Sequence, residues 1–132
     1  MHALQAPIAL AGRLFLAAIF VLEGWLKVKD PGGTASYMTA HGVAAGLLPL
    51  VILTELGGGV LVAAGLLTRF AALALAGFCL LAALFFHRDF AEPGQTVHFL
   101  KNLAIAGGFL ALVAFGPGAW SLDHWQRRTT KD

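Results

Sequence analysis

The stretch that decides the fold is LLPLVILTELGGGVLVAAGLLTR, residues 47–69. It consists of apolar and small residues interrupted by one carboxylate, Glu55, which is followed by three glycines. A helix rises about 1.5 Å per residue, so residues 46–67 are long enough to cross a hydrocarbon core about 30 Å thick. Glu55 would then lie near the middle of the bilayer. Because charge is costly there, Glu55 needs a proton, a cationic partner or a polar ligand.

The composition of the whole chain is that of a membrane protein. Hydrophobic residues make up 58% of the 132 residues and charged residues only 12%, with a mean hydropathy of +0.78. A soluble domain has about twice that charged fraction. Four apolar segments, which do not alternate as strands do, occur at 7–27, 46–67, 70–86 and 98–115. We therefore expect one all-α domain over residues 1–132, a bundle of four transmembrane helices.

The connections between the segments predict the topology. Residues 29–46 form a long loop with proline and glycine breakers and room for a short helix around Tyr37 and Met38. The short connection Thr68-Arg69 makes the second and third helices antiparallel neighbours. An even number of spans places both termini on one side of the membrane.

A small excess of basic residues indicates which side holds the termini. The tail contains Arg127, Arg128 and Lys131, and cytoplasmic segments are enriched in such residues. We expect both termini in the cytoplasm and the loops 28–45 and 87–97 on the other side. The sequence pI near 9 fits contact with anionic lipid headgroups better than nucleic acid, because no basic stripe alternates with exposed aromatic residues.

Polar residues gather in the half of the bundle away from the termini. Glu23 and Lys27 are spaced i, i+4 on the first helix and can pair directly. In the predicted topology they share this half with several other polar side chains, and Glu55 lies at the bottom of the resulting funnel. The group comprises Glu23, Lys27, His41, His87, His98, Lys101 and Asn102.

This arrangement predicts a ligand site. A flat molecule such as a quinone needs an apolar slot and a few groups that bind its oxygens. Phe20 and Phe86 could flank its ring, and Gly58 and Gly59 lie on the same helix face as Glu55 and could leave room for it. Its oxygens would meet Glu55, His87 or Lys101. The predicted partner of Glu55 is Arg13 or Lys101, and we expect Arg13 and Arg69 to form structural ion pairs.

Structural roles for the same residues stay open. Lys27, Arg69 and Lys101 could extend to the membrane surface, and the pair Glu23–Lys27 could only orient its helix. Asn102 could bond to a neighbouring helix. The glycines are explained most simply by close approach of helix backbones, and Glu55 could merely tie helices together.

Other chemistry is disfavoured. Cys79 is the single cysteine, so the chain has no internal disulfide and no CxxC redox couple. The histidines lack the i, i+4 spacing of a helical metal-ligand pair, so no metal site is predicted. No redox cofactor motif appears. We expect no intrinsic cofactor and no enzyme that acts alone.

The ordered set of motifs resembles the DoxX family of small four-helix proteins of the bacterial inner membrane. The resemblance rests on GRLFLAAIFVLEGWLKVKDP, TELGGGVLVAAGLLTRFAAL, FFH and HFLKNLAIAGGFLALVAFGPGAWSLD, which together cover nearly the whole chain. Glu23 departs from the pattern, where a small or polar residue is expected before the glycine. The resemblance implies a location in the bacterial inner membrane. Members of this family are commonly labelled as subunits of a quinol oxidoreductase, so the resemblance also implies that role.

The function expected from the residues and this resemblance is binding of a quinone or another small lipophilic molecule. The protein would act as a subunit that supports electron transfer by other membrane or redox proteins. One alternative is a non-catalytic subunit whose small-residue faces assemble or stabilise a larger membrane complex. A third is a pathway for protons or small solutes through Glu23 and Glu55.

Overall fold

The computed structural model describes residues 2–130, and these are almost entirely helical. Four helices are long and apolar enough to cross a membrane, at Leu4–Lys29, Ala45–Ala64, Thr68–Phe86 and Gln95–Phe115. The predicted all-α fold with four membrane spans is therefore confirmed. The chain order of the elements is α1 (His2–Lys29), α2 (Pro31–Ala40), η1 (Ala45–Leu47), α3 (Leu48–Ile52), η2 (Leu53–Gly57), α4 (Gly58–Ala64), α5 (Thr68–Phe86), α6 (Gln95–Phe115) and α7 (Leu122–Thr129).

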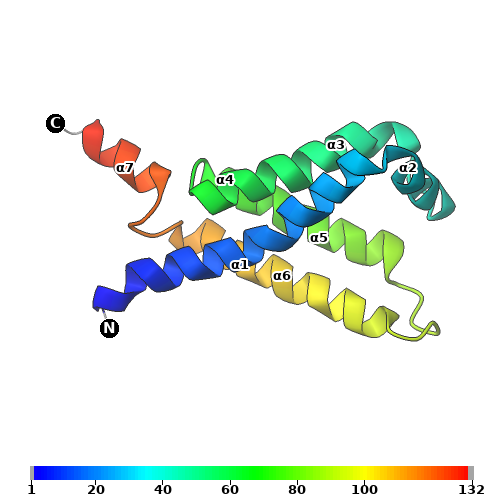
Figure 1. Cartoon of the computed structure of the whole chain (residues 1–132). Helices are drawn as coiled ribbons and strands as arrows, with labels where there is room; N and C mark the ends of the chain where they lie inside the picture. Colours follow the sequence, from blue (N-terminus) through cyan, green and yellow to red (C-terminus); the bar gives the residue numbers. More distant parts are fainter. Residues whose placement is uncertain (1, 131–132) are drawn as a thin grey trace.

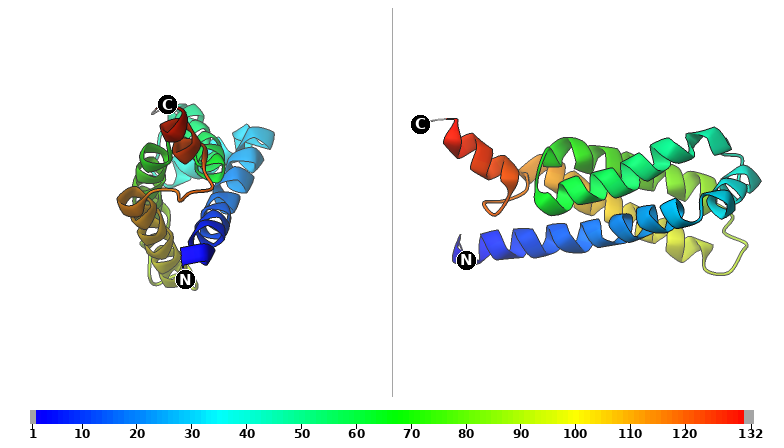
Figure 2. Two further views of the ribbon diagram at one scale, coloured as in Figure 1. Left: turned by 90° about the vertical axis from the view of Figure 1, so that its left-hand side faces the viewer. Right: turned by 45° about the horizontal axis from the view of Figure 1, so that its top comes forward.

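The helices form an elongated bundle with two distinct ends. Figure 1 shows the N-terminus and α7 at one end, and α2 and the connection from α5 to α6 at the other. The most extensive contact is between α5 and α6, whereas α1 packs mainly on η2 and α4. Figure 2, seen from the terminus end, shows the α5–α6 pair on one side and α1 on the other. Below, these are called the terminus end and the α2 end.

The observed helix bounds differ from the expected ones at several points. The second span ends at Ala64, because Gly65 (φ +71°) and Leu67 (φ +48°) adopt left-handed conformations that stop a helix. The turn therefore consists of residues 65–67, and Thr68 and Arg69 already belong to α5. The short helix predicted around Tyr37 is α2, which Asp30 caps by accepting a hydrogen bond from the Gly33 N–H.

Glycines let α1 and the second span approach closely. A Cβ on Gly24 would lie 2.7 Å from the backbone nitrogen of Leu56, and one on Gly59 would lie 3.1 Å from that of Val21. A Cβ on Gly58 would meet Leu75 of α5 at 3.1 Å. Gly24 and Gly59 therefore lie against the backbone of a neighbouring helix, the packing predicted for Gly59, whereas Gly58 makes room for a side chain. Neighbouring helices fill the space beside Gly58 and Gly59, which do not line a cleft.

Apolar side chains occupy both the centre and the outside of the bundle. In the centre, Phe20 packs edge-on against Phe109, with ring centroids 5.3 Å apart, and against Phe78 at 6.4 Å. Many large apolar side chains point outward from the four spans, among them Phe15, Leu22, Leu53, Phe70, Leu84 and Phe115. Helices that are apolar on all sides belong in lipid.

Arg13 holds the terminus end together. Its side chain, only 2% exposed, donates hydrogen bonds to three backbone carbonyls. Nη1 binds Pro117 O at 2.7 Å, Nη2 binds Trp120 O at 2.9 Å, and Nε and Nη2 bind Ala63 O at 3.3 and 3.2 Å. The prediction of an ion pair is therefore corrected, because the carbonyls at the end of α4 and in the loop after α6 need donors that lipid cannot supply.

Arg69 also bonds to a carbonyl instead of a carboxylate. Its Nη2 donates to Ala114 O at 3.3 Å, near the end of α6. The carbonyls in the last turn of a helix have no intrahelical partner, so a nearby guanidinium satisfies one of them. Within residues 2–130, the ion pairs lie at the α2 end and involve Lys27.

Asp123 fastens the C-terminal segment to the turn before α5. Its carboxylate accepts hydrogen bonds from the Leu67 and Thr68 N–H groups at 2.8 and 2.9 Å, and its own N–H donates to Gly65 O at 2.8 Å. Burial alone would raise the pKa of Asp123, but the hydrogen bonds from Thr68 and Leu67 and the charge of Arg127 together hold that pKa below its ordinary value. The carboxylate thus caps a helix that lies far from it in sequence.

We predict that both chain termini are cytoplasmic and that α2 faces the other side. The structure places the two regions at opposite ends of the bundle, and Arg127 and Arg128 bias their end toward the cytoplasm. Lys131, which supports the same prediction, lies outside the described residues. In cells expressing a Cys79→Ala background, cysteines introduced at Ser36 and Thr130 should be labelled by an impermeant thiol reagent from opposite sides. Labelling of both from the same side would contradict this topology.

Asp123→Asn should lower thermal stability in detergent near neutral pH by the equivalent of about 0.5–2 kcal/mol, the usual value of a helix cap. Because the folded pKa of Asp123 is depressed, its stabilisation is present above the unfolded pKa of about 3.9 and is lost as the pH falls through the folded pKa. The melting difference between the wild type and Asp123→Asn should therefore persist at mildly acidic pH and shrink at strongly acidic pH. Asp89→Asn, in the exposed loop, is the matched control, and an equal effect there would refute the capping role.

Candidate functional site

The candidate site is an ion-pair cluster between α1 and η2. Lys27 Nζ lies 2.9 Å from Oε2 of Glu55 and 3.3 Å from Oε2 of Glu23. The exposed fraction of the side chains rises from 5% for Glu55 to 20% for Lys27 and 49% for Glu23. Glu55 thus has a cationic partner, as expected, but the partner is Lys27 and not Arg13 or Lys101. Arg13 is engaged by carbonyls at the terminus end.

The backbone around Glu55 is unusual. Residues Leu53–Gly57 form a π-helical turn inside the second span, with regular α-helix on both sides. Single π-turns within α-helices occur frequently at functional sites. Gly24 makes the cluster geometrically feasible, because any side chain at this position would collide with Leu56 in that turn. The backbone conformation of the second span and its close approach to α1 therefore bring the three charged side chains together.

The cluster has chemical capacity beyond a simple ion pair. Two carboxylates surround one ammonium, so the three groups together can accept a further proton. The ammonium has three N–H donors, and the two carboxylates engage no more than two of them. A polar oxygen of a ligand could take the third. Because exposure increases from Glu55 to Glu23, polar groups lead from the buried carboxylate to the surface of the bundle.

A second cluster, at the α2 end, is the predicted pair His87 and His98, and the predicted Phe86 packs separately with Tyr37 and His41. The rings of His87 and His98 stack with centroids 5.1 Å apart, and His87 Nδ1 lies 2.8 Å from Oε1 of Gln95. The ring of Phe86 stacks on Tyr37 of α2 at 5.3 Å. The rings of Phe86 and His41 are also 5.3 Å apart.

Gln95 and Tyr37 were not predicted as part of a site. Tyr37 and His41 are spaced i, i+4 after a sequence that starts a helix, Asp30-Pro31, and this pattern could have indicated a shared face. The position of Gln95 depends on α6 starting earlier than its apolar segment does, for which hydropathy gives no signal.

The other predicted residues do not join these two clusters. Asn102 donates to His98 O in its own helix at 3.0 Å instead of to a neighbouring helix. Phe20 belongs to the central aromatic packing, and Lys101 is exposed. Among residues 2–130, no hydrogen bond or ion pair connects the histidines with Lys27. Within the same residues, no group of three or more His, Cys, Asp or Glu side chains is arranged to hold a metal ion.

We predict that Glu55→Gln destabilises the protein through loss of the pair with Lys27. Removing one member of a buried ion pair typically costs about 3–5 kcal/mol, but Lys27 keeps Glu23 as a partner at 3.3 Å, so we expect a smaller loss here. Thermal unfolding in detergent should show a clear decrease in stability for Glu55→Gln and little change for Glu92→Gln in the exposed loop. The double variant Lys27→Met/Glu55→Met should recover much of the loss, since it leaves no buried charge. Equal melting of the two single variants would mean that the Glu55 pair is not energetically important.

Comparisons with known proteins agree with a fold that spans the membrane. The sequence model of the DoxX family matches residues 8–88. The chain is 47% identical over 124 residues to inner membrane protein YqjF of Escherichia coli (strain K12), covering 94% of this chain and 95% of that one. It is 32% identical over 129 residues to inner membrane protein YphA of the same organism, covering 92% of each. No solved structure matches it. The chain is therefore an integral membrane protein that belongs to the DoxX family.

Proposed function

We propose that the protein binds a quinone or a similar small lipophilic molecule beside Lys27 and supports electron transfer by partner proteins in the membrane. The observation that carries the proposal is the cluster of Lys27, Glu23 and Glu55. It presents a partly exposed ammonium with a spare hydrogen-bond donor in an apolar bundle. A quinone carbonyl is a suitable acceptor for that donor, and the carboxylates could exchange the protons that accompany quinone reduction.

The surroundings of the cluster suit such a ligand. Leu26 lies one helical turn after Glu23 on α1 and is 47% exposed, so apolar surface borders the exposed part of the cluster. The two cavities described in the structure lie at the terminus end. In this proposal the ligand enters laterally from the bilayer between helices, with its tail remaining in lipid.

Assembly with another membrane protein is a second candidate, favoured by glycines that no neighbour covers. A Cβ added to Gly12, Gly77 or Gly107 would meet no atom within 4 Å, so these positions leave the backbone open to an incoming helix. Mass spectrometry of gently extracted protein would distinguish the two candidates. Bound quinone supports the first, and a stoichiometric partner protein supports the second.

The binding test is a titration of purified protein in zwitterionic nanodiscs with a short-chain quinone, followed by quenching of tryptophan fluorescence. The wild type should show saturable binding. In Lys27→Gln/Glu55→Gln, which removes both charges of the pair, we expect the affinity to fall about tenfold, equivalent to about 1.4 kcal/mol. The double variant leaves no unpaired buried charge from this pair, so a loss of binding is separated from a loss of folding.

Lys29→Gln is the matched control, because Lys29 lies on the same helix and is exposed. Its affinity should equal that of the wild type. Unchanged affinity in the double variant would move the site elsewhere and leave Glu55 with a structural role. Weakening by Lys101→Gln alone would place the ligand near the start of α6.

A further inference from the structure

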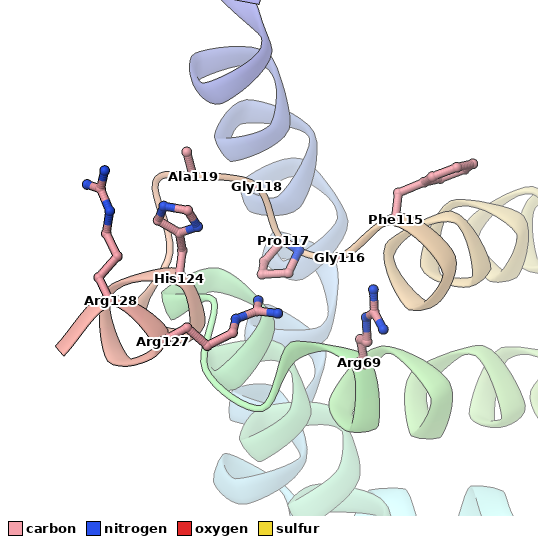
Figure 3. Close-up of a pocket in the computed structure, with 9 residues that line it drawn as sticks. All are labelled: Arg69, Phe115, Gly116, Pro117, Gly118, Ala119, His124, Arg127 and Arg128. Atoms are coloured by element: carbon pink, nitrogen blue, oxygen red, sulfur yellow. The ribbon is translucent and has the colours of Figure 1, made fainter. Parts of the chain in front are cut away.

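The terminus end contains a cavity of about 440 Å³ with a strongly cationic lining. Three arginines, Arg69, Arg127 and Arg128, line it together with His124 and the loop of residues 116–119. Figure 3 shows Arg69 on one side and Arg127 extending beneath the loop from α7, with Arg128 at the outer edge. Among residues 2–130, no acidic side chain lines this cavity.

The guanidinium groups keep unused donors. Arg69 is joined to Ala114 O through Nη2, and Arg127 is joined to Asp123 O through Nε at 3.1 Å. A guanidinium has five N–H donors, so several in each group stay free for an anion. The carboxylate of Asp123, which belongs to the same helix as Arg127, already accepts hydrogen bonds from the N–H groups of Leu67 and Thr68. The positive charge around the cavity is therefore in excess.

The cavity lies at the level where lipid headgroups are found. It is bordered by the first turn of α5 and the last residue of α6, where two membrane spans end. Phe115, which lines the cavity, is 88% exposed, and Trp120 and Trp125 nearby are also largely exposed. Aromatic residues of this kind sit at the membrane–water interface, and basic pockets between membrane helices at that depth bind anionic lipid headgroups.

We propose that this cavity binds the phosphate of an anionic phospholipid headgroup, with Arg69, Arg127 and Arg128 as its donors and the acyl chains running along Phe115. Guanidinium groups recognise phosphate oxygens through paired N–H donors. The exposed phenylalanine beside the cavity favours a lipid over free phosphate as the source of the anion, because only a lipid brings apolar chains to the same place. This site is separate from the Lys27 cluster and does not depend on the function proposed for it.

The test is a native mass spectrometry titration of the full-length protein with phosphatidylglycerol and with phosphatidylcholine of the same acyl chains. We expect phosphatidylglycerol to bind clearly more tightly than phosphatidylcholine. The double variant Arg127→Gln/Arg128→Gln should lose this preference. We expect its affinity for phosphatidylglycerol to fall about fivefold for each arginine removed, because each basic residue near the surface contributes about 1 kcal/mol. The matched control is Lys29→Gln/Arg88→Gln, which removes two exposed cations from the α2 end.

Several outcomes would overturn the proposal. One is an equal affinity for the two lipids in the wild type, and another is the same loss of preference in the control as in the arginine double variant. Arg128→Glu serves as a second variant, because the side chain of Arg128 is exposed and its substitution is not expected to affect folding. Retention of the lipid preference in Arg128→Glu would count against the site. Inorganic phosphate is titrated in parallel, and stronger arginine-dependent stabilisation by phosphate than by the lipid would overturn the lipid as its source.

Discussion

The bonds of Arg13 to Ala63, Pro117 and Trp120 are the interaction on which the terminus end of the bundle depends. A helix leaves its last carbonyls without partners, and in hydrocarbon no water replaces them. One buried guanidinium binds the end of α4 and the loop after α6, and so connects these two parts of the chain to α1. Gly65 has room for no side chain here, because a Cβ would lie 2.9 Å from the guanidinium carbon of Arg13. The carboxylate of Asp123 then completes the turn that Gly65 begins.

The same helix carries the second cation, Lys27, on nearly the same face. Fourteen residues separate the two, which is about four helical turns and about 21 Å along the axis. Between them, Val21 packs against Gly59 and Gly24 packs against Leu56. The contacts run in antiparallel register, from Arg13 with Ala63 to Lys27 with Glu55. Helix α1 is thus joined to the second span by a cation at each end and by close backbone packing between them.

The spans and the burial of Glu55 were predictable, because hydropathy and length determine what can cross a bilayer. The partner of Glu55 was not. From the sequence, Lys27 was expected to end its helix and to pair with Glu23 at i, i+4. In the structure α1 continues to Lys29, and Gly24 allows η2 to lie beside α1. The π-turn has no recognisable pattern in the sequence. The bonds of Arg13 to carbonyls have none either, because every residue has a carbonyl. The glycines indicated close packing, but not which helix would fill the space beside them.

The pair of Lys27 and Glu55 is more than the packing of α1 requires. Backbone contacts at Gly24 and Gly59 and the bonds of Arg13 already hold α1 against the second span. Apolar side chains of similar size often stabilise a buried contact as well as an ion pair does, because the charges must first be desolvated. A π-turn that places a carboxylate in mid-membrane, together with a second carboxylate that is half exposed, adds polar groups without adding packing. This surplus of polar groups over what packing requires is the reason why the proposed ligand site is assigned to this cluster.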